Sequence, residues 1–207
     1  MTATTLDPRT ALVLVDLQKG IAGLPTVHPS AQTIERGSRL AAAFRARGLP
    51  VVLVRVAGAA PGRTEATLGG RGERPADWAE LMPELDRQDG DIVVTKHQWG
   101  AFHGTDLDLQ LRRRGVTQLV IGGIATAFGV ESTARAAHEH GYHVTIAVDA
   151  VTDVDERTHR NSVERVFPLL GETDTTDAII KLLGWARGGR GRARTGVARV
   201  RARPARG

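Results

Sequence analysis

Two charged residues and one glycine-containing turn stand where buried strands are expected to end. Asp16 follows the aliphatic run ALVLV, and Lys96 closes the run IVVTK. Residues 122–135, GGIATAFGVESTAR, begin as the end of a strand and continue as the start of a helix, with Gly129 in the turn. A carboxyl group, an amine and the N–H groups of a helix N-terminus could together transfer a proton and hold an anion.

The position of Asp16 and Lys96 directly after aliphatic runs indicates that both are partly buried. A partly buried carboxylate either pairs with a cation or binds its proton more tightly than it does in water. The two residues could therefore form a structural ion pair at the end of a sheet. They could equally form a coupled acid and base whose pKa values are shifted by their surroundings. The sequence leaves both interpretations open.

Gly129 needs a physical reason, because glycine in a helix costs up to about 1 kcal/mol relative to alanine. The reason is either the close approach of a ligand or tight packing against a strand. The chain has no cysteine, which excludes disulfides, thiolate metal sites and a cysteine nucleophile.

Predicted strands and helices alternate along the chain. The aliphatic runs predict strands at 11–16, 50–56, 91–96, 118–123 and 143–150. Helices are expected at 30–47, 105–115, 128–141 and 155–169, and in a last segment that ends near residue 183. This order is typical of an α/β fold, in which a parallel sheet has helices on both faces. Ligands of such sheets bind beyond the carboxyl ends of the strands, near the point where strand order reverses.

The overall composition is that of a globular protein with a basic tail. The chain has 207 residues, of which 41% are hydrophobic and 25% charged, and its net charge is +5. Eight arginines and no acidic residue lie in 185–207, and without these eight arginines the net charge falls from +5 to −3. We expect one domain at 1–184 and a disordered Arg/Gly/Ala-rich tail at 185–207. Such a tail could bind a polyanion, but we expect a solvated appendage without a nucleic-acid partner.

The sequence also predicts a location. No apolar run reaches the ~18 to 20 residues that cross a bilayer, and the N-terminus MTATTLDPRT lacks the features of a secretion signal. We therefore expect a cytoplasmic protein that does not contact membranes.

Three segments resemble the isochorismatase-like superfamily, often called the cysteine hydrolases. They are ALVLVDLQKG, VVTKHQWGAFHGTDLDLQLRRRGV and LVIGGIATAFGVESTARAAHEHGYHVTIAVDA, and the match covers nearly all of 9–183. The resemblance implies a three-layer α/β/α, Rossmann-like fold with a six-stranded parallel sheet, commonly in an oligomer. It implies an Asp–Lys–Cys triad at Asp16, Lys96 and position 129. It also implies a cis peptide between Ile124 and Ala125.

The sequence departs from that triad because Gly129 stands where the family's amidases have the nucleophilic cysteine. The family's isochorismatase branch also lacks the cysteine, typically with glycine in its place. Those enzymes cleave an enol ether, in which an acid protonates the vinyl carbon and water attacks the resulting cation. The resemblance thus implies a hydrolase of a small, anionic metabolite, with Asp16 as the acid, Lys96 tuning it and Gly129 leaving space for substrate.

Six further residues are candidates for substrate binding, although the aromatic members fit a hydrophobic core equally well. They are Gln18, Trp99, Phe102, Ile124, Ala125 and Phe128. The polar pair that the isochorismatase branch carries after strand two has no convincing match, although Arg63 could substitute.

We expect neither a metal nor a cofactor. The Asp-x-His arrangement of the family's nicotinamidases is missing after strand two, and His97 and His103 are more typical of polar loop residues. Ser132 and Thr133 lie about one helical turn beyond Gly129 without a histidine base, so we do not expect a replacement nucleophile.

Two other readings of the departure remain open. The protein could be a non-catalytic metabolite-binding member of the family, although such a protein need not keep a titrating Asp–Lys pair. Alternatively, a cysteine could have been removed from position 129 by engineering.

Overall fold

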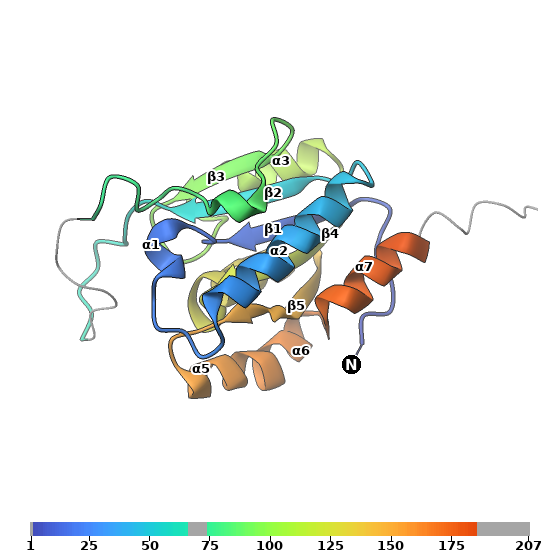
Figure 1. Cartoon of the computed structure of the whole chain (residues 1–207). Helices are drawn as coiled ribbons and strands as arrows, with labels where there is room; N and C mark the ends of the chain where they lie inside the picture. Colours follow the sequence, from blue (N-terminus) through green and yellow to red (C-terminus); the bar gives the residue numbers. More distant parts are fainter. Residues whose placement is uncertain (1, 66–73, 186–207) are drawn as a thin grey trace, which may run out of the picture.

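Six parallel strands form one sheet in the computed structural model, which describes residues 2–65 and 74–185 (Figure 1). The spatial order is β3-β2-β1-β4-β5-β6, and each neighbouring pair is parallel. The strands are β1 (Thr10–Val15), β2 (Val51–Val56), β3 (Ile92–Lys96), β4 (Gln118–Ile124), β5 (His143–Thr152) and β6 (Glu172–Asp174). The predicted α/β fold with a six-stranded parallel sheet is confirmed.

Helices cover both faces of this sheet. The longer ones are α2 (Ser30–Arg45), α3 (Leu107–Arg113), α4 (Glu131–Glu139) and α7 (Thr176–Trp185). The short ones are α1 (Lys19–Ala22), η1 (Pro83–Leu85), η2 (Thr126–Val130), α5 (Glu156–Asn161), η3 (Ser162–Val166) and α6 (Phe167–Leu170). The segments α5, η3 and α6 follow one another without a break and together account for the helix predicted at 155–169.

Side chains that alternate along the buried strands supply both halves of the core. On one face, α2 and α7 lie side by side (Figure 1), and Ile34 and Ile179 pack in one cluster with Leu14 of β1. On the other face, Leu107 of α3 and Ala134 of α4 belong to a cluster with Val13. Burial on both faces explains why the sequence of β1 is continuously apolar.

The strand order reverses between β1 and β4, at the centre of the sheet. The chain runs outward from β1 through β2 to β3 and then returns to β4 beside β1. Gly123, near the end of β4, has a φ of +130°, and a Cβ on it would lie 2.1 Å from the carbonyl oxygen of Val15. Only glycine fits such a close approach of backbones. This reversal leaves the crevice in which ligands of open parallel sheets bind.

Two further predictions concern the C-terminal tail and the absence of a membrane-spanning segment. The tail predicted at 185–207 lies outside the described residues apart from Trp185, at which α7 ends. The proposed boundary after residue 184 therefore stays a prediction. In the described part of the chain, we find no helix with the length and apolarity needed to span a bilayer.

Candidate functional site

Asp16 and Lys96 meet at the carboxyl edge of the sheet as a buried ion pair. Lys96 Nζ donates a hydrogen bond of 2.7 Å to Asp16 Oδ2 and a second, of 3.0 Å, to the carbonyl oxygen of Gln98. The Lys96 and Asp16 side chains are only 1% and 7% exposed. Asp16 directly follows β1 and Lys96 ends β3, so the lysine spans the end of β2, which lies between them. The structure thus brings together two residues that are 80 positions apart.

The Asp16 carboxyl group is less well satisfied than its partner. Its second oxygen, Oδ1, is buried and has no hydrogen-bond partner among the described residues. Burial raises the pKa of Asp16 to about 6, because the loss of hydration outweighs the lowering by the nearby Lys96 ammonium. A carboxyl group with this pKa is half protonated near pH 6, and in that form it can donate a proton to a substrate.

Gly129 borders the same carboxyl group. A Cβ at this position would lie 3.1 Å from Asp16 Oδ2 and 2.9 Å from Val15 Cγ1. Tight packing against β1, one of the two interpretations of the glycine, is therefore observed. The other interpretation, close approach of a ligand, stays a prediction. Asp16, Lys96 and Gly129 occupy one small region built from β1, β3 and the turn after β4.

The turn after β4 has the cis peptide between Ile124 and Ala125 that the resemblance implied. The N–H groups of Phe128 and Val130 both donate to the carbonyl oxygen of Ala125, at 3.2 Å. The Ala127 N–H donates to a carboxylate at 2.6 Å. We expected N–H groups at this helix start to be available to an anion. These three are not, because the π-helical turn and a buried acid already use them.

That buried acid is Asp153, which was not among the site residues predicted from the sequence. Its Oδ2 accepts from Ala127 N–H and its Oδ1 from Val154 N–H, at 2.6 and 2.7 Å. Asp153 directly follows β5, as Asp16 follows β1, and the same pattern could have identified it. It was missed because the predicted strand stopped at Ala150, whereas β5 continues to Thr152.

A histidine, also missed, supports the turn from a third side. Nδ1 of His159, on α5, lies 2.9 Å from the hydroxyl oxygen of the fully buried Thr126. Burial lowers the pKa of His159, and the neighbouring His28 lowers it further. The edge of the His28 ring packs on the His159 ring, with centroids 5.0 Å apart.

Two of the predicted aromatic residues pack on each other. Trp99 is 55% exposed and packs edge-to-face on Phe128, with ring centroids 5.0 Å apart. Each ring is next in sequence to a residue that contacts the pair, since Gln98 accepts from Lys96 and Gly129 borders Asp16. The predicted Ile124 and Ala125 form the cis peptide that precedes the π-helical turn.

The other two residues predicted to bind substrate, Gln18 and Phe102, instead stabilise the fold. Gln18 is fully buried, and its side-chain amide accepts from Val56 N–H and donates to the carbonyls of Val56 and Trp78. The ring of Phe102 stacks on His140, at 5.1 Å, within the core cluster on the α3 and α4 face. Phe102 therefore follows the core interpretation of the aromatic residues.

The structure also describes the polar residues considered as metal ligands or as a replacement nucleophile. Within 2–65 and 74–185, no three His, Asp or Glu residues are grouped so that they could hold a metal ion; that the protein needs none stays a prediction. The hydroxyl of Thr133 donates to the Gly129 carbonyl at 2.6 Å and accepts from Ala101 N–H. This hydroxyl serves to fix the start of α4.

Comparison with known proteins agrees with this geometry. The sequence model of the isochorismatase domain family matches residues 10–178 of this chain. The isochorismatase family protein YwoC of Bacillus subtilis is 45% identical over 179 residues, which cover 84% of this chain and 93% of YwoC. The ureidoacrylate amidohydrolase RutB of Variovorax paradoxus is 31% identical, over 83% of this chain and 80% of RutB.

Solved structures give the same result. An isochorismatase family protein from Burkholderia thailandensis has 43% identity and a TM-score of 0.83, covering 87% of this chain and 98% of its own. N-carbamoylsarcosine amidase from Thermoplasma acidophilum has 27% identity and a TM-score of 0.68, with 82% and 97% covered. With the fold, the buried Asp–Lys pair and the turn after β4, these matches show that the chain belongs to the isochorismatase family of hydrolases.

Proposed function

We propose that this protein cleaves the enol-ether bond of a small anionic metabolite, with Asp16 as the proton donor and without a covalent intermediate. The observation that carries the proposal is the state of the Asp16 carboxyl group. It is buried, has one oxygen without a partner, and has a pKa raised to about 6 although Lys96 is 2.7 Å away. Perturbed acids of this kind are concentrated at functional sites.

The proposed reaction consumes one water molecule. The protonated Asp16 donates its proton to the terminal vinyl carbon, and the adjacent carbon becomes an oxygen-stabilised cation. Water adds to that carbon and returns a proton to Asp16. The resulting hemiketal breaks its C–O bond, which gives a ketone and an alcohol. No side-chain nucleophile takes part in these steps, so a glycine at position 129 is compatible with them.

Lys96 supports the choice of an anionic substrate. When Asp16 is ionised, the two charges cancel within the pair. When Asp16 holds its proton, the Lys96 ammonium has lost its counter-charge and can attract a substrate carboxylate. Binding of an anion therefore favours the protonated form of Asp16, the form that the reaction requires.

Two relatives are named as hydrolases of amides, namely the ureidoacrylate amidohydrolase and N-carbamoylsarcosine amidase. Gly129 has no side chain that could attack an amide carbon. A Cβ there would already crowd Asp16 Oδ2 and Val15 Cγ1. These two points favour ether cleavage over covalent amide hydrolysis in this chain.

We propose the remaining features as part of the same function. Trp99 and Phe128 would contact the body of the substrate, because each is next in sequence to a residue that contacts the pair and Trp99 is largely exposed. The reaction as written needs no metal. The exposed aromatic surface at the site is consistent with a homo-oligomer, whose mass light scattering would determine.

The test is turnover of isochorismate and related vinyl ethers by the purified full-length chain. We expect product with the wild type and with Asp91→Asn, a matched removal of a buried acid elsewhere, but at least about 100-fold slower turnover with Asp16→Asn. Absence of any turnover that Asp16→Asn lowers to this extent would contradict the proposal. Thermal stabilisation by these compounds without product would instead favour a non-catalytic binding protein.

A further inference from the structure

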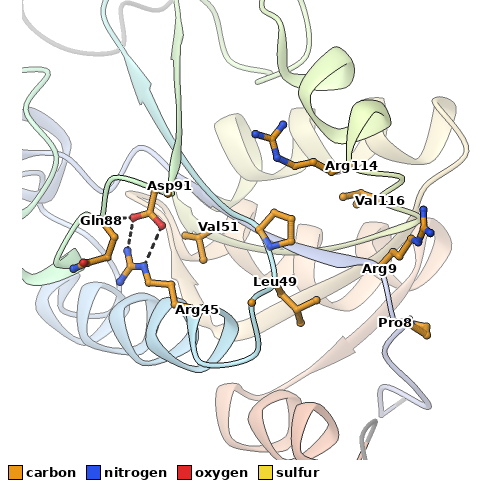
Figure 2. Close-up of a pocket in the computed structure, with 12 residues that line it drawn as sticks. Pro8, Arg9, Arg45, Leu49, Val51, Gln88, Asp91, Arg114 and Val116 are labelled. Atoms are coloured by element: carbon orange, nitrogen blue, oxygen red, sulfur yellow. Dashed lines mark hydrogen bonds and ion pairs between the residues drawn. The ribbon is translucent and has the colours of Figure 1, made fainter. Parts of the chain in front are cut away.

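A cavity lies at the opposite, amino edge of the sheet, away from the Asp16–Lys96 pair. Its volume is about 630 Å³, and it opens between the starts of β1 and β2 and the ends of α2 and α3 (Figure 2). The residues that matter for its chemistry are Arg9, Arg45, Leu49, Val51, Arg114 and Val116. Small-molecule sites commonly have volumes of about 300 to 1,000 Å³.

The cavity has an apolar base. Val51 and Val116 are almost completely buried, and Leu49 and Pro50 are half-buried beside them. Figure 2 shows Leu49, Val51 and Val116 between Arg45 at one end and Arg9 at the other. An apolar group of a ligand would therefore contact aliphatic side chains there.

Two cations at this cavity have no acidic partner. Among the described residues, no carboxylate forms an ion pair with Arg9 or Arg114, whereas Arg45 is neutralised by Asp91. Arg114 donates to the carbonyl and to the side-chain oxygen of Gln110, at 2.9 and 2.8 Å. The cavity therefore carries two uncompensated positive charges above an apolar base.

Hydrogen bonds hold Arg114 in position, whereas the Arg9 side chain forms none with the described residues. The Arg9 guanidinium packs directly over Gly115, where a Cβ would lie 2.1 Å from its Nη1. Arg114 is restrained by its two hydrogen bonds within α3. A ligand that binds Arg114 therefore orders a side chain that is already partly restrained, which lowers the entropic cost of that contact.

We infer that this cavity is a second binding site, for a small carboxylic acid with an apolar body. The apolar body packs on Leu49 and Val51, and the carboxylate accepts hydrogen bonds from Arg9 and Arg114. Guanidinium groups suit this role because their N–H groups match a carboxylate and stay charged at all physiological pH values. This site does not depend on the proposed enol-ether reaction.

The experiment is a titration of the full-length chain with benzoate, followed by amide chemical shifts in NMR spectra. We expect the shifts to concentrate at Leu49, Val51 and Val116, and not in 124–130 at the candidate active site. The neutral isostere benzamide should bind at least about tenfold more weakly, since it lacks the charge that the guanidinium groups recognise.

Variants that remove one positive charge each distinguish specific binding in the cavity from non-specific electrostatic attraction of benzoate. Arg9→Gln and Arg114→Gln should each raise the Kd for benzoate about tenfold, the loss expected for one charge-assisted contact. Arg113→Gln is the matched control, because Arg113 is exposed on the same helix but does not line the cavity. It should leave the Kd unchanged.

Three results would overturn the inference. One is the absence of shifts at Leu49, Val51 and Val116 up to about 10 mM benzoate, well above a millimolar Kd. Another is equal binding of benzamide. The third is an equal effect of Arg113→Gln and Arg114→Gln, which would mean that the arginines only complement the C-terminal end of α3.

Discussion

Two buried ion pairs lie at opposite edges of the same sheet. They differ in how many hydrogen bonds the carboxylate accepts. At the amino edge, Asp91 accepts from Nε and Nη2 of Arg45, at 3.1 and 2.7 Å, and from Gln88 N–H at 2.9 Å. At the carboxyl edge, Asp16 accepts one hydrogen bond, from Lys96, and its other oxygen has no partner in the described chain. The exposed fractions of the two acids are similarly small.

This difference shows that a buried carboxylate in an ion pair can still have a strongly shifted pKa. Both oxygens of Asp91 are bonded, and the guanidinium binds them as a fork, which is the geometry of a stable structural pair. A lysine offers Asp16 a single point charge, so desolvation prevails and the pKa rises to about 6. We therefore assign the Arg45–Asp91 pair to structure and propose chemistry for Asp16.

The largest expected effect separates the two acids by activity. Asp16→Asn should lower turnover of a vinyl-ether substrate by about 10²- to 10⁴-fold, the usual contribution of general acid catalysis. Asp91→Asn should leave turnover close to that of the wild type, because Asp91 lies at the other edge of the sheet. Steady-state kinetics of both variants measure this, and equal losses would remove the functional distinction.

Removing the cation should affect stability next most strongly. Lys96→Met leaves a buried carboxylate without its partner, and at pH 7 we expect the free energy of unfolding to fall by about 3–5 kcal/mol. The double variant Asp16→Asn with Lys96→Met should recover most of that loss, because no charge then remains buried. Urea denaturation of the two single variants and the double variant gives the coupling energy. Additive losses would show that the two side chains do not act as a pair.

The raised pKa of Asp16 predicts how stability and rate depend on pH. The folded protein ionises Asp16 at a pKa of about 6, against 3.8 for the ordinary group. The folded state thus holds an extra proton between these values, and the free energy of unfolding falls as pH rises from about 3.8 to 6, by ~3 kcal/mol in total.

The reaction rate should also fall as the pH rises. Because the protonated form is the proposed donor, kcat/KM should fall about tenfold per pH unit above pH 6. Asp16→Asn should flatten the stability profile over this range, whereas Asp91→Asn should not. A rate that instead rises through pH 6 would point to the ionised carboxylate as the working form.

The smallest effect concerns the glycine beside the pair. Gly129→Ala places a methyl group 2.9 Å from Val15 Cγ1, and we expect the free energy of unfolding to fall by about 1–3 kcal/mol from overpacking. Combining it with Val15→Ala should cost less than the two losses added together, because the methyl group then has room. Additive losses measured in urea would mean that the two positions do not compete for space.

The sequence predicted most of the fold because its signals were local. Five strands were read from aliphatic runs such as that of β1, and their observed bounds differ from the prediction by two residues at most. The short β6 has only three half-buried residues and gives no such run, so only the family resemblance implied a sixth strand. The end of β5 was placed two residues early, and Asp153 was missed for that reason.

By itself the sequence also determined which chemistry is open to the site: with no cysteine and a glycine at position 129, a thiol nucleophile is excluded. Only the tertiary structure decided which polar atoms are left without partners. Asp16 follows a strand and Asp91 precedes one, but the sequence does not show how either carboxylate is hydrogen-bonded. The Arg45 guanidinium of α2 binds both oxygens of Asp91. Lys96, which reaches across β2, binds only one oxygen of Asp16. That difference depends on distances between segments far apart in the chain, and such distances exist only once the sheet has formed.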